Sequence, residues 1–341
     1  MAYFACNASR PSRPLPTLLL WITVLCPLPA SAADQPAPQI PQPVAQKPQP
    51  EGSGDMDIAR DYLSGKITGF ASYIDRFFGG DRHYQESNQT VLQLDFTRAM
   101  GYGVSRNNDF SARMNLKLPV TEGRLRLLVE TDPERNITAE ETPALVSTLP
   151  QAQIAAPPSV ALAVRVEQAK KERWHFSTDG GMQFHGLGST PFARARGSFT
   201  TPMGAWRLKA AQSAYWFYTI GAGETSQLDL EHLISEPLLF RATSTATWLR
   251  NTLNFDLRQD LSFYHTLNDR TALLYQASAI GVSNPQTHVT DYVALVSYRY
   301  RLHREWLFLS LTPQLHFPNE RNYRATGALI MTLEILFDES R

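Results

Sequence analysis

Cysteine is nearly absent from this sequence, and both cysteines stand near its beginning. Cys6 and Cys26 fall within residues 1–32, the segment that we expect to be removed from the mature protein. A mature chain without cysteine forms no disulfide, has no thiol nucleophile and offers no thiolate to a metal. We therefore expect no cysteine chemistry in its function.

A long apolar run and a net charge are missing as well. After residue 32 no stretch approaches the roughly 18 apolar residues that a membrane-spanning helix requires. The 32 basic and 32 acidic residues cancel, so no overall basic field attracts nucleic acid. We therefore expect neither membrane-spanning helices nor a nucleic-acid partner.

The start of the chain has the features of a secretory signal peptide. Arg10 and Arg13 supply a basic region, residues 17–26 form a short apolar stretch, and an Ala-Ser-Ala cleavage site ends at Ala32. We predict a signal peptide over residues 1–32, cleaved after Ala32, and therefore an exported protein.

The next two segments differ from each other in pattern. Residues 33–55 are rich in proline, glutamine and alanine, which predicts a disordered linker. Residues 56–80 have helical periodicity, and apolar residues at intervals of three and four share one face of a helix over 56–78. These apolar residues are Leu63, Ile67, Phe70, Ile74 and Phe77.

Residues 88–337 alternate between apolar and polar side chains, as strands with one apolar face do. Fourteen such segments occur, most of them near the 9–11 residues that a tilted transmembrane strand needs. They are 89–98, 109–119, 123–131, 159–169, 172–180, 191–201, 205–218, 226–234, 238–249, 252–264, 271–282, 290–302, 305–316 and 324–337. The predicted fold is all-β: a transmembrane antiparallel up-and-down barrel of fourteen strands, or twelve if segments near 226–264 are misassigned, preceded by one amphipathic helix.

The connections and the tryptophans agree with a membrane barrel. If the first strand runs outward, inward turns such as 170–171 are short, and most outward loops, such as 132–158 and 181–190, are longer. Five tryptophans stand near strand ends and predict two aromatic girdles around an apolar band about 25 Å tall. They are Trp174, Trp206 and Trp306 at inner ends, with Trp216 and Trp248 at outer ends.

The last strand carries a resemblance. Leu333, Ile335 and Phe337 alternate along a final amphipathic segment that ends in an aromatic residue. This resembles the C-terminal insertion signal of bacterial outer-membrane β-barrel proteins, although residues 338–341 follow the phenylalanine. The resemblance implies insertion by the barrel-assembly machinery and outer-membrane lipid as the surroundings.

Charged side chains concentrate at positions that face the inside of the predicted barrel, where water or opposite charge can meet them. The basic ones form a predicted wall of Arg124, Arg126, Arg173, Arg194, Arg196, Arg207, Lys209 and Arg241. Two interpretations stay open. The wall favours anions in a pore or ligand site, or it belongs to a salt-bridged lumen that only stabilises the barrel.

No motif predicts catalysis. His175, Asp179 and His185 have a spacing that merely permits a metal or acid–base site near the outer rim. The glycine-rich stretch 180–188 does not open a helix as a phosphate-binding loop would, and we read it as a strand end and an outer turn. We predict no catalytic, cofactor-binding or metal-binding residue and no cofactor, so an enzyme is not the favoured class.

The sequence therefore predicts an outer-membrane pore or channel for small solutes or ligands, with anions favoured. One alternative is a non-conducting structural or envelope-assembly partner, in which helix 56–78 recruits a periplasmic protein. Another is a lipid-modifying enzyme with its site at the rim. The helix itself has four interpretations: it packs on the rest of the protein, plugs the barrel, lies on the inner leaflet or binds a partner.

Overall fold

The computed structural model describes residues 66–67, 69–75, 77–78, 90–102, 108–118, 124–134, 159–168, 173–304 and 306–338. All of these belong to the compact unit Glu51–Arg341. The predicted signal peptide, the predicted linker and the first part of the predicted helix lie outside the described residues. Within the described ranges, no helix is long and apolar enough to cross a membrane.

Fourteen strands make up most of the described chain. They are β1 (Val91–Gly101), β2 (Asn108–Lys117), β3 (Leu125–Thr131), β4 (Val160–Glu167), β5 (Trp174–His185), β6 (Gly188–Met203), β7 (Trp206–Phe217), β8 (Gly221–Ser235), β9 (Leu238–Leu249), β10 (Asn254–Asn268), β11 (Thr271–Val282), β12 (His288–His303), β13 (Leu307–Pro318) and β14 (Thr326–Asp338). A short 3-10 helix, Asn319–Arg321, precedes β14.

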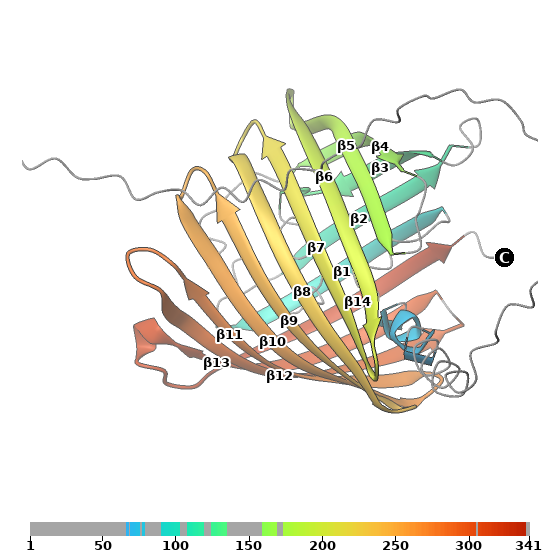
Figure 1. The fold of residues 1–341 in the computed structure, drawn as a ribbon, viewed down its shortest axis with the longest axis vertical. Coiled ribbons are helices and arrows are strands. Elements are labelled where there is room, and N and C mark those ends of the chain that lie inside the picture. The colour runs from blue at the N-terminus through green and yellow to red at the C-terminus, as the bar shows by residue number, and fades with distance from the viewer. Residues whose placement is uncertain are drawn as a thin grey trace, which may run out of the picture. The chain divides into compact units, whose positions relative to one another are not determined.

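Each strand pairs antiparallel with its neighbours in the sequence, and β1 pairs with β14, so that the sheet closes on itself (Figure 1). At the closure Leu92 lies opposite Phe337, and Phe96 lies opposite Leu333. Closure leaves no strand edge with unpaired backbone groups, which is the condition for a sheet in hydrocarbon. The predicted fourteen-strand up-and-down barrel is confirmed, and the twelve-strand alternative is wrong.

Burial alternates along the strands as the sequence pattern predicts. On β4 the side chains of Leu162 and Val164 are exposed on the outside, while Ala163 and Arg165 are buried on the inside. An apolar exterior around a polar interior is the reverse of a water-soluble protein. It matches a barrel whose outer face meets lipid.

One predicted loop is wrong. Residues 181–190 were expected to form a long outer loop, but β5 continues to His185 and β6 begins at Gly188. The alternation runs on through Gln183, which is buried, and Phe184, which is exposed, so the strands need not stop at the glycines. Gly186 has a φ of +60°, which lets the chain reverse in a two-residue turn.

The two ends of the barrel carry different connections. We call one the helix end; it has the turns 204–205, 236–237 and 269–270, and also Arg304 and Trp306 between β12 and β13. We call the other the loop end; it has the connections 186–187, 218–220, 250–253, 283–287 and 319–325. The difference in length between the two sets is smaller than predicted, because β5, β6 and β8 extend beyond their predicted segments.

A short helix lies at the helix end. It is described at residues 66–67, 69–75 and 77–78, and we call it the lumen helix. Of its predicted apolar face, Ile67, Ile74 and Phe77 are buried, whereas Leu63 lies outside the described residues. Phe70 is partly buried against the apolar cluster that contains Ile74 and Phe77. The face therefore contacts inward-facing side chains of the barrel.

Candidate functional site in the barrel lumen

The predicted basic wall divides into two groups in the structure. Six of its members belong to strands on the lumen side, either buried or half-buried: Arg126, Arg194, Arg196, Arg207, Lys209 and Arg241. The other two are exposed beside the connections that precede β3 and β5: Arg124 and Arg173. The wall is therefore shorter than the sequence suggested.

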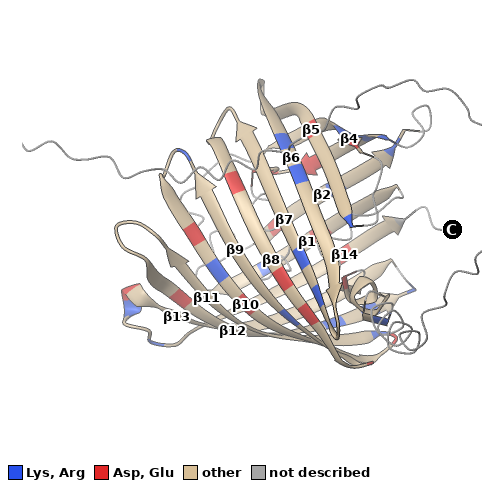
Figure 2. Ribbon diagram, in the orientation of Figure 1, with Lys and Arg blue, Asp and Glu red and all other residues tan. Residues whose placement is uncertain are grey.

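One group of lumen charges, which we call the Asp179 network, joins β3 to β6. Asp179 accepts hydrogen bonds from Arg165 Nε at 2.6 Å and Nη2 at 2.8 Å, and from Arg194 Nε at 2.9 Å. Arg194 Nη2 also contacts Glu130 at 3.2 Å. Arg165 and Asp179 are 0% and 1% exposed, so these charges depend on one another rather than on water. Figure 2 marks the basic residues of these strands in blue and the acidic ones in red.

A second group, the Glu231 network, joins β7, β8 and β9 to the lumen helix. Glu231 is fully buried and pairs with both Arg207 and Arg241. Arg241 Nη2 reaches Asp75 of the helix at 2.7 Å, and Arg241 Nη1 donates to the Tyr264 hydroxyl at 3.3 Å. The contact between Arg241 and Asp75 could not be predicted from the sequence pattern, because the two residues are 166 positions apart.

Further ion pairs lie on other strands. Arg126 pairs with Glu167, Arg258 with Asp260, and Arg299 with Glu334, at 2.9, 2.8 and 2.7 Å. Oppositely charged groups therefore face most of the lumen cations. This arrangement corresponds to the salt-bridged lumen among the two interpretations of the basic wall, and it reduces the positive field available to an anion.

The histidines whose spacing merely permitted a site are not brought together. His175 and His185 stand at opposite ends of β5, with Asp179 between them. Another histidine, His316, is fully buried, and its Nδ1 lies 2.9 Å from Asp291 Oδ2 while Nε2 lies 3.0 Å from Gln314 Oε1. Both ring nitrogens are thus occupied. Within the described parts of the chain, no group of three His, Cys, Asp or Glu could hold a metal ion.

At the loop end, Tyr102 connects the start of the barrel to its last hairpin. Its hydroxyl donates to Glu320 Oε1 at 2.5 Å, and the guanidinium of Arg321 lies 5.0 Å from its ring. Burial, together with the bond to the Glu320 carboxylate, raises the pKa of Tyr102 to about 12. The phenol therefore stays protonated as a donor across the neutral range.

The predicted insertion residues and four of the five predicted girdle tryptophans lie on the outer face. Trp174 and Trp216 are exposed there, and Trp206 and Trp248 are half-buried. The fifth, Trp306, is exposed in the turn between β12 and β13. Trp174, Trp206 and Trp306 stand toward the helix end, and Trp216 and Trp248 toward the loop end. On β14, Leu333, Ile335 and Phe337 occupy alternate positions, and Phe337 is exposed.

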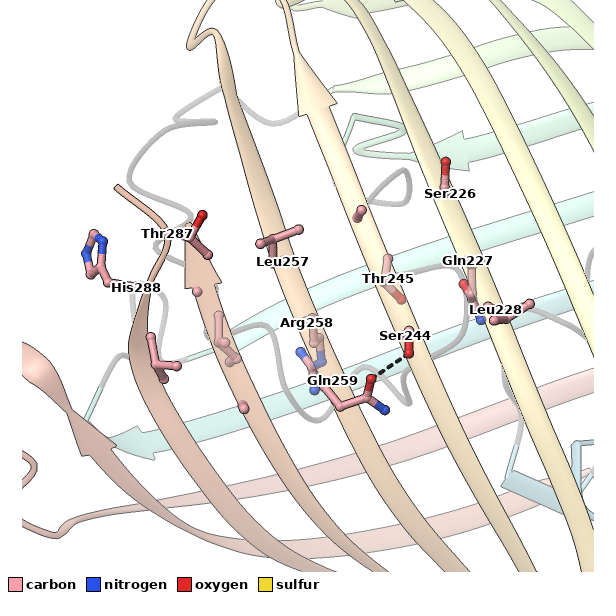
Figure 3. Close-up of a pocket in the computed structure, with 15 residues that line it drawn as sticks. Ser226, Gln227, Leu228, Ser244, Thr245, Leu257, Arg258, Gln259, Thr287 and His288 are labelled. Atoms are coloured by element: carbon pink, nitrogen blue, oxygen red, sulfur yellow. Dashed lines mark hydrogen bonds between the residues drawn. The ribbon is translucent and has the colours of Figure 1, made fainter. Parts of the chain in front are cut away.

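A hollow of about 570 Å³ is lined by residues of β8 to β12, most of them on the outer face. Small residues such as Ser244 and Ala279 form part of its lining, and Leu228 and Gln259 border it (Figure 3). The Ser244 hydroxyl donates to Gln259 Oε1 at 2.5 Å (Figure 3). Polar groups on a lipid-facing wall are tolerated when they satisfy one another in this way.

This pair yields a stability prediction. The variant S244A removes the hydroxyl that Gln259 uses and should destabilise the barrel by about 1–2 kcal/mol, because an amide oxygen then faces hydrocarbon without a donor. The double variant S244A/Q259L removes both polar groups and should unfold close to the wild type. Urea unfolding in lipid vesicles measures the difference; equal losses in the two variants would contradict it.

The sequence matches no protein-family model and no curated protein. Solved structures that align with it include a bacterial polysaccharide outer membrane secretin, at 9% identity and a TM-score of 0.43, covering 73% of this chain and 99% of that one. They also include OprB of Pseudomonas putida, at 10% identity and a TM-score of 0.43, covering 76% of this chain and 96% of that one. The outer membrane channel DcaP of Acinetobacter baumannii aligns at 8% identity and a TM-score of 0.41, covering 73% of this chain and 96% of that one.

The class of protein follows from the barrel itself. A closed antiparallel barrel with an apolar exterior and a charged interior is the architecture of bacterial outer-membrane β-barrel proteins. The predicted class-level resemblance to outer-membrane β-barrel proteins is thereby confirmed.

Proposed function

We propose that the protein is exported, loses residues 1–32 after Ala32, and forms a pore in the outer membrane for small hydrophilic solutes. The observation that supports this best is the polar lining of a closed fourteen-strand barrel. About eight strands enclose a space that side chains alone can fill, and 16–18 leave an aqueous channel. A barrel of fourteen strands lined by residues such as Gln93, Gln276 and Thr312 is close in size to the barrels that leave an aqueous channel.

The solute preference follows from the ion pairs. Arg207 and Arg241 share Glu231, and Arg194 lies between Asp179 and Glu130, so little of the basic wall is uncompensated. We infer a preference for anions that is present but weak. A basic wall without facing carboxylates would have implied a strong preference for anions.

Planar-bilayer recording tests the pore. The refolded mature protein, and a variant that lacks residues 33–80, are each reconstituted and recorded in symmetric salt. Stepwise currents from at least one of them support the proposal. An absence of current from both, with each shown to be folded by its heat-dependent migration in gels, overturns it.

The selectivity prediction uses two acids of β8 that point to opposite faces. E231Q removes a buried lumen carboxylate and leaves Arg207 and Arg241 partly uncompensated, whereas E224Q removes an exposed outer one. One unit charge at about 7 Å in water changes the free energy of an ion by about 0.6 kcal/mol. We therefore expect E231Q to raise the anion-to-cation permeability ratio about threefold or more, and E224Q to leave it unchanged.

Reversal potentials across a salt gradient give that ratio. A shift of equal size in both variants, or a shift toward cations in E231Q, would show that Glu231 does not face the conduction path.

A further inference from the structure

The lumen has an apolar patch at the helix end that a polar pore does not require. Phe308 and Tyr264 face inward there and contact two phenylalanines of the lumen helix. The ring centroids of Phe77 and Phe308 are 5.8 Å apart at 81°, and those of Phe78 and Tyr264 are 5.2 Å apart at 73°. Edge-to-face contacts of this kind add to the energy of apolar burial.

The same patch receives the rest of the helix face. Ala71 and Ile74 are both 0% exposed and belong to one cluster with Leu239 and Leu274 of the barrel wall. The helix therefore buries most of its described apolar face against β9 to β13, on the inside of the barrel, and Phe70 of that face is partly buried.

Two kinds of charged contact hold the helix in addition. Arg241 binds Asp75 while it is itself fixed by Glu231; the side chains of Arg241 and Glu231 are 4% and 0% exposed, and that of Asp75 is 16% exposed. Arg301 lies over the ring of Phe77 at 5.3 Å. The pair between Lys66 and Glu236 of the β8–β9 turn is exposed at 41% and 78%, and such pairs contribute little to stability.

The helix is held much less firmly than the barrel around it. Each strand is fixed by hydrogen bonds to two neighbours, whereas a helix of this length is marginal in water without packing. Its retention therefore depends on the contacts just described, and these can be lost while the barrel stays folded.

We propose that the helix end of the lumen is a binding site for the chain's own lumen helix, which closes the pore as a removable plug latched by the Asp75–Arg241 pair. This rests on the proposed function as a pore. The site fits an amphipathic helix that presents apolar residues at intervals of three and four and one carboxylate.

The first experiment measures undocking without any current. A cysteine is placed at Ala71, whose side chain faces the barrel, in a mature chain that lacks Cys6 and Cys26. Its rate of reaction with a methanethiosulfonate reagent is measured in vesicles, alone and combined with D75N or K66Q. D75N breaks the buried pair, and K66Q is the matched control because it breaks the exposed one.

We expect D75N to raise the labelling rate about tenfold or more, since loss of one partner of a buried pair is strongly destabilising, and K66Q to change it less than about twofold. Equal rates in all three proteins would overturn the latch.

The second experiment links docking to conduction in the full mature chain. D75N should raise the fraction of time that the pore is open severalfold over the wild type. In K66C/E236C/D75N, a short cleavable cross-linker between the two cysteines should abolish that gain, and its cleavage should restore it.

The two proposals fail in different ways. Full conduction by the wild type that neither D75N nor cross-linking alters overturns the plug and leaves the pore. Faster labelling in D75N without current from any variant overturns the pore, and with it closure by the helix.

Discussion

Replacing Asp179 with asparagine is expected to destabilise the folded barrel by about 3–5 kcal/mol, the largest loss that we predict for a lumen residue. Asp179 is 1% exposed and accepts hydrogen bonds from Arg165 and Arg194. An amide supplies neither the charge nor the second acceptor, so Arg165 keeps a buried charge without a carboxylate. Urea unfolding in vesicles, followed by tryptophan fluorescence, measures the loss.

A second variant separates two effects on the free energy of unfolding: the loss from leaving Arg165 without Asp179, and the net contribution of the Arg165–Asp179 pair. R165M/D179L removes both partners and leaves Arg194 with Glu130. Buried ion pairs replaced by apolar residues of similar size are often as stable as before, so we expect it to recover most of what D179N loses. E236Q, which removes an exposed carboxylate, should leave the stability close to that of the wild type. A double variant that is less stable than D179N would show that the pair itself stabilises the barrel.

The strands could be predicted from the sequence because the membrane imposes a simple period. Most outward-facing residues of a lipid-facing strand are apolar, and the outward residues Leu162 and Val164 on β4 and Leu333 and Ile335 on β14 follow this pattern. The continuation of β5 to His185 and the start of β6 at Gly188 were missed because the glycines suggested a loop over 181–190. Glycines at 180 and 181 look like a strand end, although Gly181 lies so close to the backbone of Leu162 that a side chain would not fit there.

The charge pairs could not be predicted, because alternation gives the face of a residue and not its neighbour. Asp179 lies opposite Arg165 on β4 and opposite Arg194 on β6, and both pairings depend on register. Moving either strand by two residues would keep every face and change each partner.

The position at which the lumen helix packs could not be predicted from the sequence, for a related reason. Periodicity identified the apolar face that contains Ile67 and Ile74, but a pattern of threes and fours does not say what the face contacts. The inward residues that receive it, among them Leu239, Tyr264 and Phe308, come from separate strands. Only the closed sheet brings them together.

An arginine introduced at Val164 is expected to cost about 2–4 kcal/mol, whereas one introduced at Leu187 should cost about 0–1 kcal/mol. Both side chains are exposed, at 44% and 109%. Val164 lies within β4 between the two ends of the barrel, and Leu187 lies in the β5–β6 turn at the loop end. In water the two substitutions would be nearly equivalent, so the difference between them reports hydrocarbon around the barrel.

The measurement compares both variants with the wild type by urea unfolding, first in lipid vesicles and then in detergent micelles. The gap between V164R and L187R should be largest in vesicles, because micelles deform around a charge more easily than a bilayer does. Val164 lies opposite Leu127 of β3 and Gly180 of β5, so no neighbouring carboxylate on the outer face offsets the arginine. Equal costs in vesicles would mean that this face does not lie in hydrocarbon, and the assignment of a membrane barrel would fail with it.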